Sequence, residues 1–220
     1  MNTNEKFVIT ISRELGSGGH TIAQKLAEKL HVRLYDKELI KQLSERFNLN
    51  PTSIERLKAQ KKHWMADFVH LLFPAPAPTA FVSAEPIRYG REYDPSVTTD
   101  DIFLAETEIL RGLAEEESCI IAGRSGFFAL KDHPNKVDIF ITASRENRIN
   151  RVMRRQNLPR EMAEADVDTV DKARENYVQR YAGVSRYDAR NYNLTLNVDG
   201  MTEDQAVAVI LAYCNVQPMM

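Results

Sequence analysis

Short runs of apolar residues alternate with longer helical patterns along most of the chain. The apolar, β-rich runs lie at 7–11, 32–35, 119–122, 137–141 and 194–198. After the first of them, Ile22, Leu26 and Leu30 recur at the spacing of one helix face. Short apolar strands that alternate with helices are typical of a parallel sheet covered on both faces. The pattern therefore predicts a three-layer α/β fold around a five-stranded parallel sheet.

Helix starts are marked by capping residues. Ser144 precedes a basic helix, and Thr202 with Gln205 forms a capping-box pair before the last helical pattern. The predicted helices begin near residue 19, cover about 37–47, start again after Pro51, and then cover 102–117, a stretch from 144, 160–181 and a closing stretch from 202. A proline-rich, aromatic segment at 73–96 interrupts this order, and loops of that length are usually functional or disordered.

Composition excludes several classes of partner. The chain has 220 residues and a net charge of −2, so no general attraction to nucleic acid or an anionic membrane is expected. No apolar stretch is long enough to span a bilayer, and no signal peptide precedes the first strand. Cys119 and Cys214 lack metal-ligand spacing and are expected to be buried thiols. We expect a cytoplasmic protein of one domain over 1–220.

The first apolar run leads directly into a glycine-rich loop and then a helix. Glycines let backbone N–H groups converge on an anion, and a helix start adds its dipole and free donors. The segment therefore predicts a phosphate cradle formed by Gly16, Ser17, Gly18, Gly19, His20 and Thr21. The alternative is that these glycines only make a tight turn between a strand and a helix.

The loop departs from the P-loop signature in two places. With Gly18 as the second glycine of the signature, the lysine position holds Gly19 and the first glycine position holds Arg13. The lysine normally supplies positive charge to the β- and γ-phosphates, so in this chain another residue must supply it. Arg13 is the nearest candidate, with His20 and Lys25 as weaker ones. Thr21, or alternatively Ser17, would supply the hydroxyl that meets a magnesium ion.

The order of these elements resembles the cytidylate kinase-like family. The resemblance rests on 9–14 with the glycines at 16–19, on 35–40, on 119–124, on 137–144 and on 192–197, and so covers nearly the whole chain. It implies a P-loop NTPase fold that transfers the γ-phosphoryl group of ATP, with Mg²⁺, to a nucleoside monophosphate, with CMP or dCMP as the expected acceptor. In this branch of the P-loop kinases, a glycine loop without the lysine looks like the usual form.

The resemblance also implies an acceptor site at the ends of the strands. Arg124 follows a core strand, Asp36 follows the second strand, and Lys37 and Arg174 are further acceptor-binding candidates. Residues 36–100 would form a helical acceptor-binding insert. Each residue also has an ordinary interpretation, since Arg124 suits a surface and Asp36 suits a helix N-cap. Ser125 stands where cytidylate kinases commonly have aspartate, which puts cytosine recognition in question.

Arginines gather on the helix that follows Ser144. Arg148, Arg151 and Arg155 fall at i, i+3 and i+7 and so share one helix face. Such a face can bind phosphates bidentately and close over them as a lid spanning 145–182. We expect Arg151 and Arg155, together with Arg13, to be the catalytic cations. The alternative is a solvated face paired with neighbouring acidic residues.

Other functions remain open at this stage. A nucleotide-binding sensor without turnover would explain the missing lysine, Ser125 and the atypical insert, and a kinase of a non-nucleotide small molecule is a further alternative. A nucleic-acid-binding protein that uses the arginine helix is disfavoured by the net charge of −2. The expected partners are small nucleotides, and Trp64 and Phe68 would suit a homodimer surface.

Overall fold

The structure is a computed structural model that describes residues 1–36 and 99–215. The chain divides into two compact units, one of 1–37 and 117–220 and the other of 38–116. Several expectations lie outside the described residues: Lys37, the helices at 37–47 and after Pro51, Trp64 with Phe68, and the proline-rich segment at 73–96. The larger unit holds the sheet.

Five parallel strands form the centre of the larger unit. In spatial order they are β2 (Arg33–Asp36), β3 (Cys119–Ala122), β1 (Val8–Arg13), β4 (Lys136–Thr142) and β5 (Leu194–Asn197). β1 lies between β3 and β4, with Ile9 opposite Ile120 on one side and Val137 on the other. This central strand is buried over its first four residues, as its continuous apolar sequence predicts. The five-stranded parallel sheet is confirmed.

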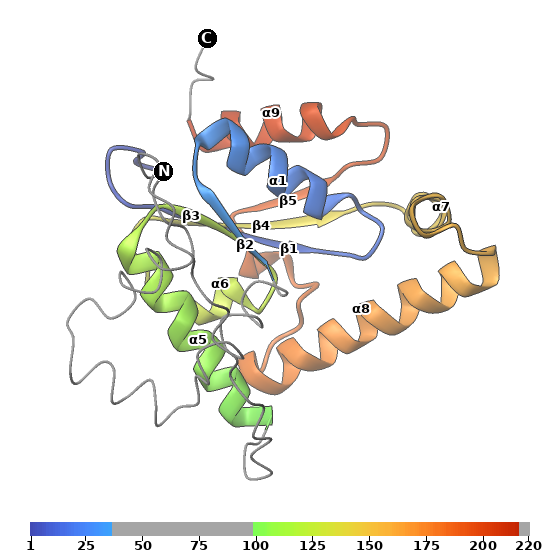
Figure 1. Ribbon diagram of the computed structural model, residues 1–220, viewed down its shortest axis with the longest axis horizontal. Helices are drawn as coiled ribbons and strands as arrows, with labels where there is room; N and C mark the ends of the chain where they lie inside the picture. The colour runs from blue at the N-terminus through green and yellow to red at the C-terminus, as the bar shows by residue number, and fades with distance from the viewer. Residues whose placement is uncertain (37–98, 216–220) are drawn as a thin grey trace, which may run out of the picture. The chain divides into compact units, whose positions relative to one another are not determined.

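Two helices cover one face of this sheet. α1 (Gly19–Leu30) and α9 (Glu203–Tyr213) lie side by side there (Figure 1). Their apolar faces join those of the strands in one buried cluster that includes Ile9, Leu26 and Ile210. The capping box of Thr202 and Gln205 is present at the start of α9. The predicted helix starts are therefore confirmed on this face.

The other helices of the larger unit are α6 (Gly126–Ala129), α7 (Arg145–Gln156) and α8 (Arg160–Ala182). α6 and α8 lie on the opposite side of the sheet from α1 and α9 (Figure 1). Ile149 and Val152 of α7 pack against Ala163 and Val167 of α8. The Ser144 side chain accepts a hydrogen bond from the Asn147 N–H, so it caps α7 as predicted. A 3₁₀ turn, η1 (Ala189–Asn191), leads into β5.

In the smaller unit the structure describes one helix, α5 (Thr99–Glu116). It begins three residues before the predicted start and ends one residue before the predicted end. Arg111 donates to Glu108 at 2.9 Å along its surface, the i, i+3 spacing of a helical ion pair.

Both cysteines are buried and free, as expected. Among the helices within 1–36 and 99–215, none combines the length and the apolar character needed to cross a bilayer.

Candidate active site

The glycine loop joins the carboxyl end of β1 to the N-terminus of α1. Ser17 is fully buried, and its Oγ donates to the Glu14 carbonyl at 2.9 Å and accepts from the Gly19 N–H at 3.4 Å. Gly18 is the N-cap of α1 with φ of 80°, a conformation that L side chains rarely adopt. The N–H groups of His20 and Thr21, in the first turn of α1, have no carbonyl partner earlier in the helix and are suited to an anion. The loop thus has the backbone geometry that a phosphate cradle requires.

A cavity of about 260 Å³ opens over this loop. Its walls are the loop, the arginine-bearing face of α7 and one residue of α8, namely Arg13, Glu14, Leu15, Gly16, Gly18, Gly19, His20, Arg151, Val152, Arg155, Gln156 and, from α8, Arg174. Arg151 lies directly above the loop, because a Cβ atom added at Gly18 would fall 1.8 Å from its Nη1. Glu203 of α9 accepts from the same Nη1 at 3.1 Å. The structure therefore brings Arg13, Arg151 and Arg155 to one cavity with most of the predicted cradle.

A second cavity, of about 410 Å³, lies beside the first. It is lined by the ends of β1 and β3 and by one face of α8: Ser12, Arg13, Gly123, Arg124, Ser125, Val170, Ala173, Arg174, Tyr177, Val178 and Arg186. Arg13 and Arg174 line both cavities. Two of the predicted acceptor-binding residues, Arg124 and Arg174, are therefore in the same cavity.

The backbone after β3 is turned sharply toward the second cavity. Gly123, Arg124 and Ser125 all have positive φ, at 88°, 54° and 50°. Such strain in residues other than glycine persists only where the surroundings hold it, and it is frequent at ligand sites. Ser125 is 5% exposed, and its Oγ has no hydrogen-bond partner among the described residues. A buried hydroxyl left without a partner is costly, so this one is suited to a bound ligand.

The electrostatics of the site centre on Arg13. Burial, and after it the charges of Arg174, Arg186 and Arg124, lower the pKa of Arg13 from its ordinary 12.5 to about 10, while Asp36 opposes them. The same causes, burial first and then Arg186, lower the pKa of Arg174. Guanidiniums crowded in this way remain charged at neutral pH but favour a bound anion between them.

Asp171 of α8 ties the glycine loop to the helices around it. Its Oδ1 accepts from the Leu15 N–H at 3.0 Å, and its Oδ2 accepts from Arg148 at 2.6 Å. Arg174 and Arg186 also contact this carboxylate, at 3.3 and 3.4 Å. Both of them in addition donate to the Arg13 carbonyl, at 3.0 and 2.6 Å. One buried carboxylate therefore fixes the loop backbone and two arginines of the second cavity.

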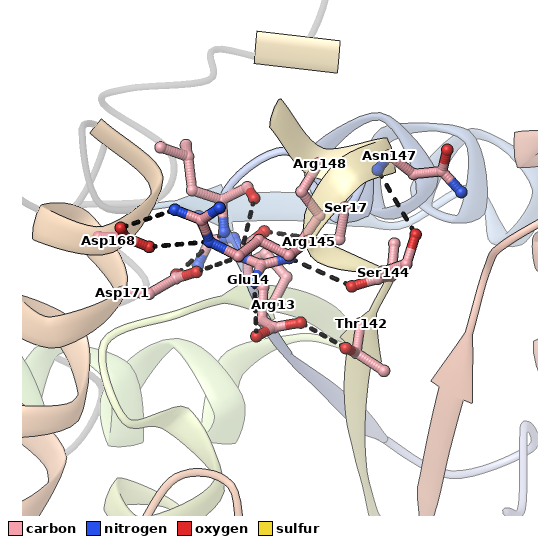
Figure 2. A network of polar contacts seen from close by, with 12 residues as sticks. Arg13, Glu14, Ser17, Thr142, Ser144, Arg145, Asn147, Arg148, Asp168 and Asp171 are labelled. Carbon is pink, nitrogen blue, oxygen red and sulfur yellow. Dashed lines mark hydrogen bonds and ion pairs between the residues drawn. The ribbon is translucent and has the colours of Figure 1, made fainter. Parts of the chain in front are cut away.

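Arg148 departs from the expectation that it shares the role of Arg151 and Arg155. Figure 2 shows its side chain directed into the network between Glu14 and Asp171. It is only 9% exposed, and its Nη1 also donates to the Leu15 carbonyl at 3.4 Å. Thr142 donates to the other oxygen of Glu14. Arg148 thus supports the loop through these contacts and lines neither of the two cavities.

The remaining predicted residues take different positions. His20 Nδ1 lies 4.0 Å from Asp36 Oδ2, which places Asp36 beside the glycine loop at the end of β2. Lys25 is paired with Asp204 of α9 at 2.8 Å, so it joins two helices and is not in either cavity. Thr21 lines a neighbouring opening together with Arg151, Arg154 and Arg155.

Magnesium would have to be held mainly by a bound nucleotide. Within the part of the chain that the structure describes, no group of three acidic, histidine or cysteine side chains could hold a metal. The Ser17 hydroxyl is occupied by the loop, which leaves Thr21 as the candidate hydroxyl. This set fits Mg²⁺, which usually keeps waters and substrate phosphates as ligands and takes few from the protein.

Several site residues were not found from the sequence. Asp171, Arg186 and Glu203 are isolated charges in polar stretches, and no local pattern distinguishes them. A further opening of about 180 Å³ is lined by Gly16, Ala143, Asn147, Arg151, Arg154 and the turn at 198–201 after β5. The only available signal for that turn was its place at the end of a strand, where ligands bind in such sheets.

A glycine loop after the first strand of a parallel sheet, with arginines converging on it from a later helix, defines the P-loop kinase class. A solved shikimate kinase from Bacteroides thetaiotaomicron shares this fold, with a TM-score of 0.51 at 13% identity, over 96% of this chain and 99% of its own. The sequence matches the cytidylate kinase-like family over residues 8–200, and the chain belongs to that family.

Two further relatives are more similar in sequence. An uncharacterized protein from Eubacterium ventriosum ATCC 27560 has a TM-score of 0.66 and 26% identity, over 96% of this chain and 100% of its own. A cytidylate kinase from Sulfurisphaera tokodaii is 27% identical over 110 residues, which are 50% of this chain and 61% of that relative. The family and the fold together support a phosphotransferase.

Proposed function

We propose that this protein transfers the γ-phosphoryl group of Mg-ATP to a nucleoside monophosphate, with CMP or dCMP as the first candidates. The observation that carries the proposal is that Arg13 and Arg174 line both cavities. Two phosphates bound on either side of them would meet at one cluster of positive charge. Phosphoryl transfer requires little else from the protein beyond alignment and charge stabilisation.

The glycine-loop cavity is the proposed site of ATP. Its N–H donors and helix dipole suit the β- and γ-phosphates, and Arg151 and Arg155 add charge from α7. ATP and Mg²⁺ are the general co-substrates of the P-loop kinase fold. In this proposal the ion is bound chiefly by the nucleotide, with Thr21 as the protein ligand.

The second cavity is the proposed site of the acceptor. Its guanidiniums suit the acceptor phosphate, while the apolar face of α8 at Val170, Ala173 and Val178 suits a base or sugar. The cytidylate kinase of Sulfurisphaera tokodaii supports a cytosine nucleotide. Ser125 is the position at which this choice is most open, because a hydroxyl selects less strictly than a carboxylate.

The test is release of ADP from Mg-ATP with each nucleoside and deoxynucleoside monophosphate in turn. We expect turnover with CMP or dCMP that is at least tenfold above the other monophosphates. A matched control replaces Arg145, an exposed α7 arginine paired with Asp168, by alanine and should leave turnover unchanged. ATP binding without turnover on any monophosphate would overturn the proposal and favour a nucleotide sensor or a different acceptor.

A further inference from the structure

Arg13 and Gly19 compete for one space in the glycine loop. A Cβ atom added at Gly19 would lie 2.6 Å from the Arg13 Cβ and 3.0 Å from its Cγ. Contacts this short essentially never occur between real atoms, so a side chain at one position excludes a side chain at the other. The P-loop signature has glycine at the first of these positions and lysine at the second, whereas this chain has arginine first and glycine second.

The Arg13 side chain extends from this space toward β3. A Cβ atom added at Gly123 would fall 2.2 Å from Arg13 Nη1, so the guanidinium passes directly over that glycine. Gly19 and Gly123 therefore form a slot that holds the Arg13 side chain. A side chain at either glycine would block this slot. The slot ends where the two cavities meet, which is why Arg13 lines both of them.

The backbone of Arg13 is fixed as firmly as its side chain. Arg174 and Arg186 both donate to its carbonyl, and both are held by Asp171. Arg13 is thus surrounded by positive charge from Arg174, Arg186 and Arg124, with Asp36 as the opposing carboxylate. A guanidinium held in this way is pre-organised for anionic oxygens and has little freedom to lose on binding.

We propose that Arg13 and Gly19 have exchanged the roles of the P-loop glycine and lysine, and that the Arg13 fork contacts the γ-phosphate of ATP and the acceptor phosphate together. The inference rests on the proposed function and adds the residue that joins its two substrates. A lysine ammonium is a compact point charge, whereas a guanidinium presents donors along two edges of a plane. A fork at the junction can therefore bind one oxygen from each phosphate.

The first test restores the usual order of the two residues. Four proteins are compared: the unchanged chain, Arg13→Gly, Gly19→Lys, and the double variant Arg13→Gly/Gly19→Lys. The readout is the ratio of dissociation constants for Mg-ADP and a non-hydrolysable Mg-ATP analogue by calorimetry, which reports the γ-phosphate contact without any acceptor. Gln24→Lys adds the same charge on an exposed position of α1 and is the control.

We expect Arg13→Gly to reduce the preference for the ATP analogue by about 10- to 100-fold, the range for a lost hydrogen bond to a charged group. Gly19→Lys should lose binding because its side chain collides with Arg13. The double variant should regain the preference to within tenfold of the unchanged chain. The inference is overturned if Arg13→Gly keeps the preference, or if the folded double variant binds no better than either single variant.

The second test distinguishes the charge of Arg13 from its packing volume, and it tests the role of Arg13 separately from the proposed kinase reaction. Arg13→Met keeps the volume in the slot without the charge, and it should show the same loss of ATP preference as Arg13→Gly. In the unchanged chain, a saturating monophosphate that is turned over should also tighten the ATP analogue, and Arg13→Met should abolish this coupling. If the unchanged chain prefers the ATP analogue but turns over none of the monophosphates, the kinase proposal is wrong. If the unchanged chain turns over a monophosphate and Arg13→Met keeps the full preference for the ATP analogue, the proposed exchange of roles is wrong.

Discussion

The Asp171 carboxylate accepts a hydrogen bond from the Leu15 N–H at 3.0 Å, across 156 residues of sequence. This contact joins α8 to the glycine loop. Arg174 and Arg186, which also contact Asp171, donate to the Arg13 carbonyl. The geometry of the loop is therefore set by a helix that also forms one wall of the second cavity. Arg174, which lines both cavities, also contacts this buried carboxylate.

Replacement of Asp171 by asparagine should be strongly destabilising. It removes the negative charge that Arg148, Arg174 and Arg186 share, and Arg148 then keeps Glu14, at 3.5 Å, as its counter-charge. Breaking a buried ion pair at one partner typically costs about 3–5 kcal/mol. Urea unfolding measures the change. The matched control is Asp168→Asn on the same helix, where an exposed pair with Arg145 should cost less than about 1 kcal/mol; equal costs would contradict a central role for Asp171.

Arg13→Met should stabilise the unliganded protein while it weakens nucleotide binding. Burial and three neighbouring guanidiniums depress the pKa of Arg13 to about 10, which means that the fold disfavours its charge. The charged form is therefore held at a cost in stability that persists at neutral pH and declines only as the pH rises through about 10. Thermal melting without ligand should shift upward by a few degrees. A lower melting temperature would indicate that Asp36 already compensates the charge.

Nucleotide binding should take up protons at mildly acidic pH. Burial, then the positive charges of Arg13 and Arg155, lower the pKa of His20 below its ordinary 6.5, with Asp36 opposing them. A phosphate bound in the glycine-loop cavity would raise that pKa again, so affinity should increase as the pH falls below 6.5. Calorimetry in two buffers with different ionisation enthalpies measures the uptake. His20→Asn should reduce it to the part that the nucleotide itself contributes.

Arg151→Ala should weaken ATP binding by about 10- to 100-fold, since it removes a charge-assisted contact above Gly18. Arg148→Ala, three residues earlier on α7, should instead lower stability, because its guanidinium is buried against Asp171 and Glu14. Dissociation constants and unfolding free energies measured on both variants separate the two effects. The assignment fails if the two variants show the same profile.

Ser125→Ala should raise the KM for the acceptor and leave the KM for ATP unchanged. Its hydroxyl is buried without a partner in the described chain and lines only the second of the two main cavities. Stability should change little, because no existing hydrogen bond is lost. Steady-state kinetics with each substrate varied in turn provides the measurement. A change confined to the KM for ATP would place the acceptor elsewhere.

Local patterns in the sequence predicted the five strands and most of the described helices, while the short helix α6 was not predicted. Apolar runs gave the buried strands, and Ser144 and the Thr202–Gln205 pair gave two helix starts that the structure confirms. The glycine loop could also be predicted from the sequence, because its backbone geometry depends on adjacent residues. These features involve neighbours within about four positions, which is the range over which a helix or turn is built.

Only the tertiary structure decided what each charge in the site does. Arg148 and Arg151 share a helix face by spacing, yet one is buried behind the loop and the other lies above it. Asp171 and the space shared by Arg13 and Gly19 depend on segments that are far apart in the chain or on close packing of side chains. Ion pairing and steric exclusion act through space, so their partners are fixed by the packing of α7 and α8 and not by sequence spacing.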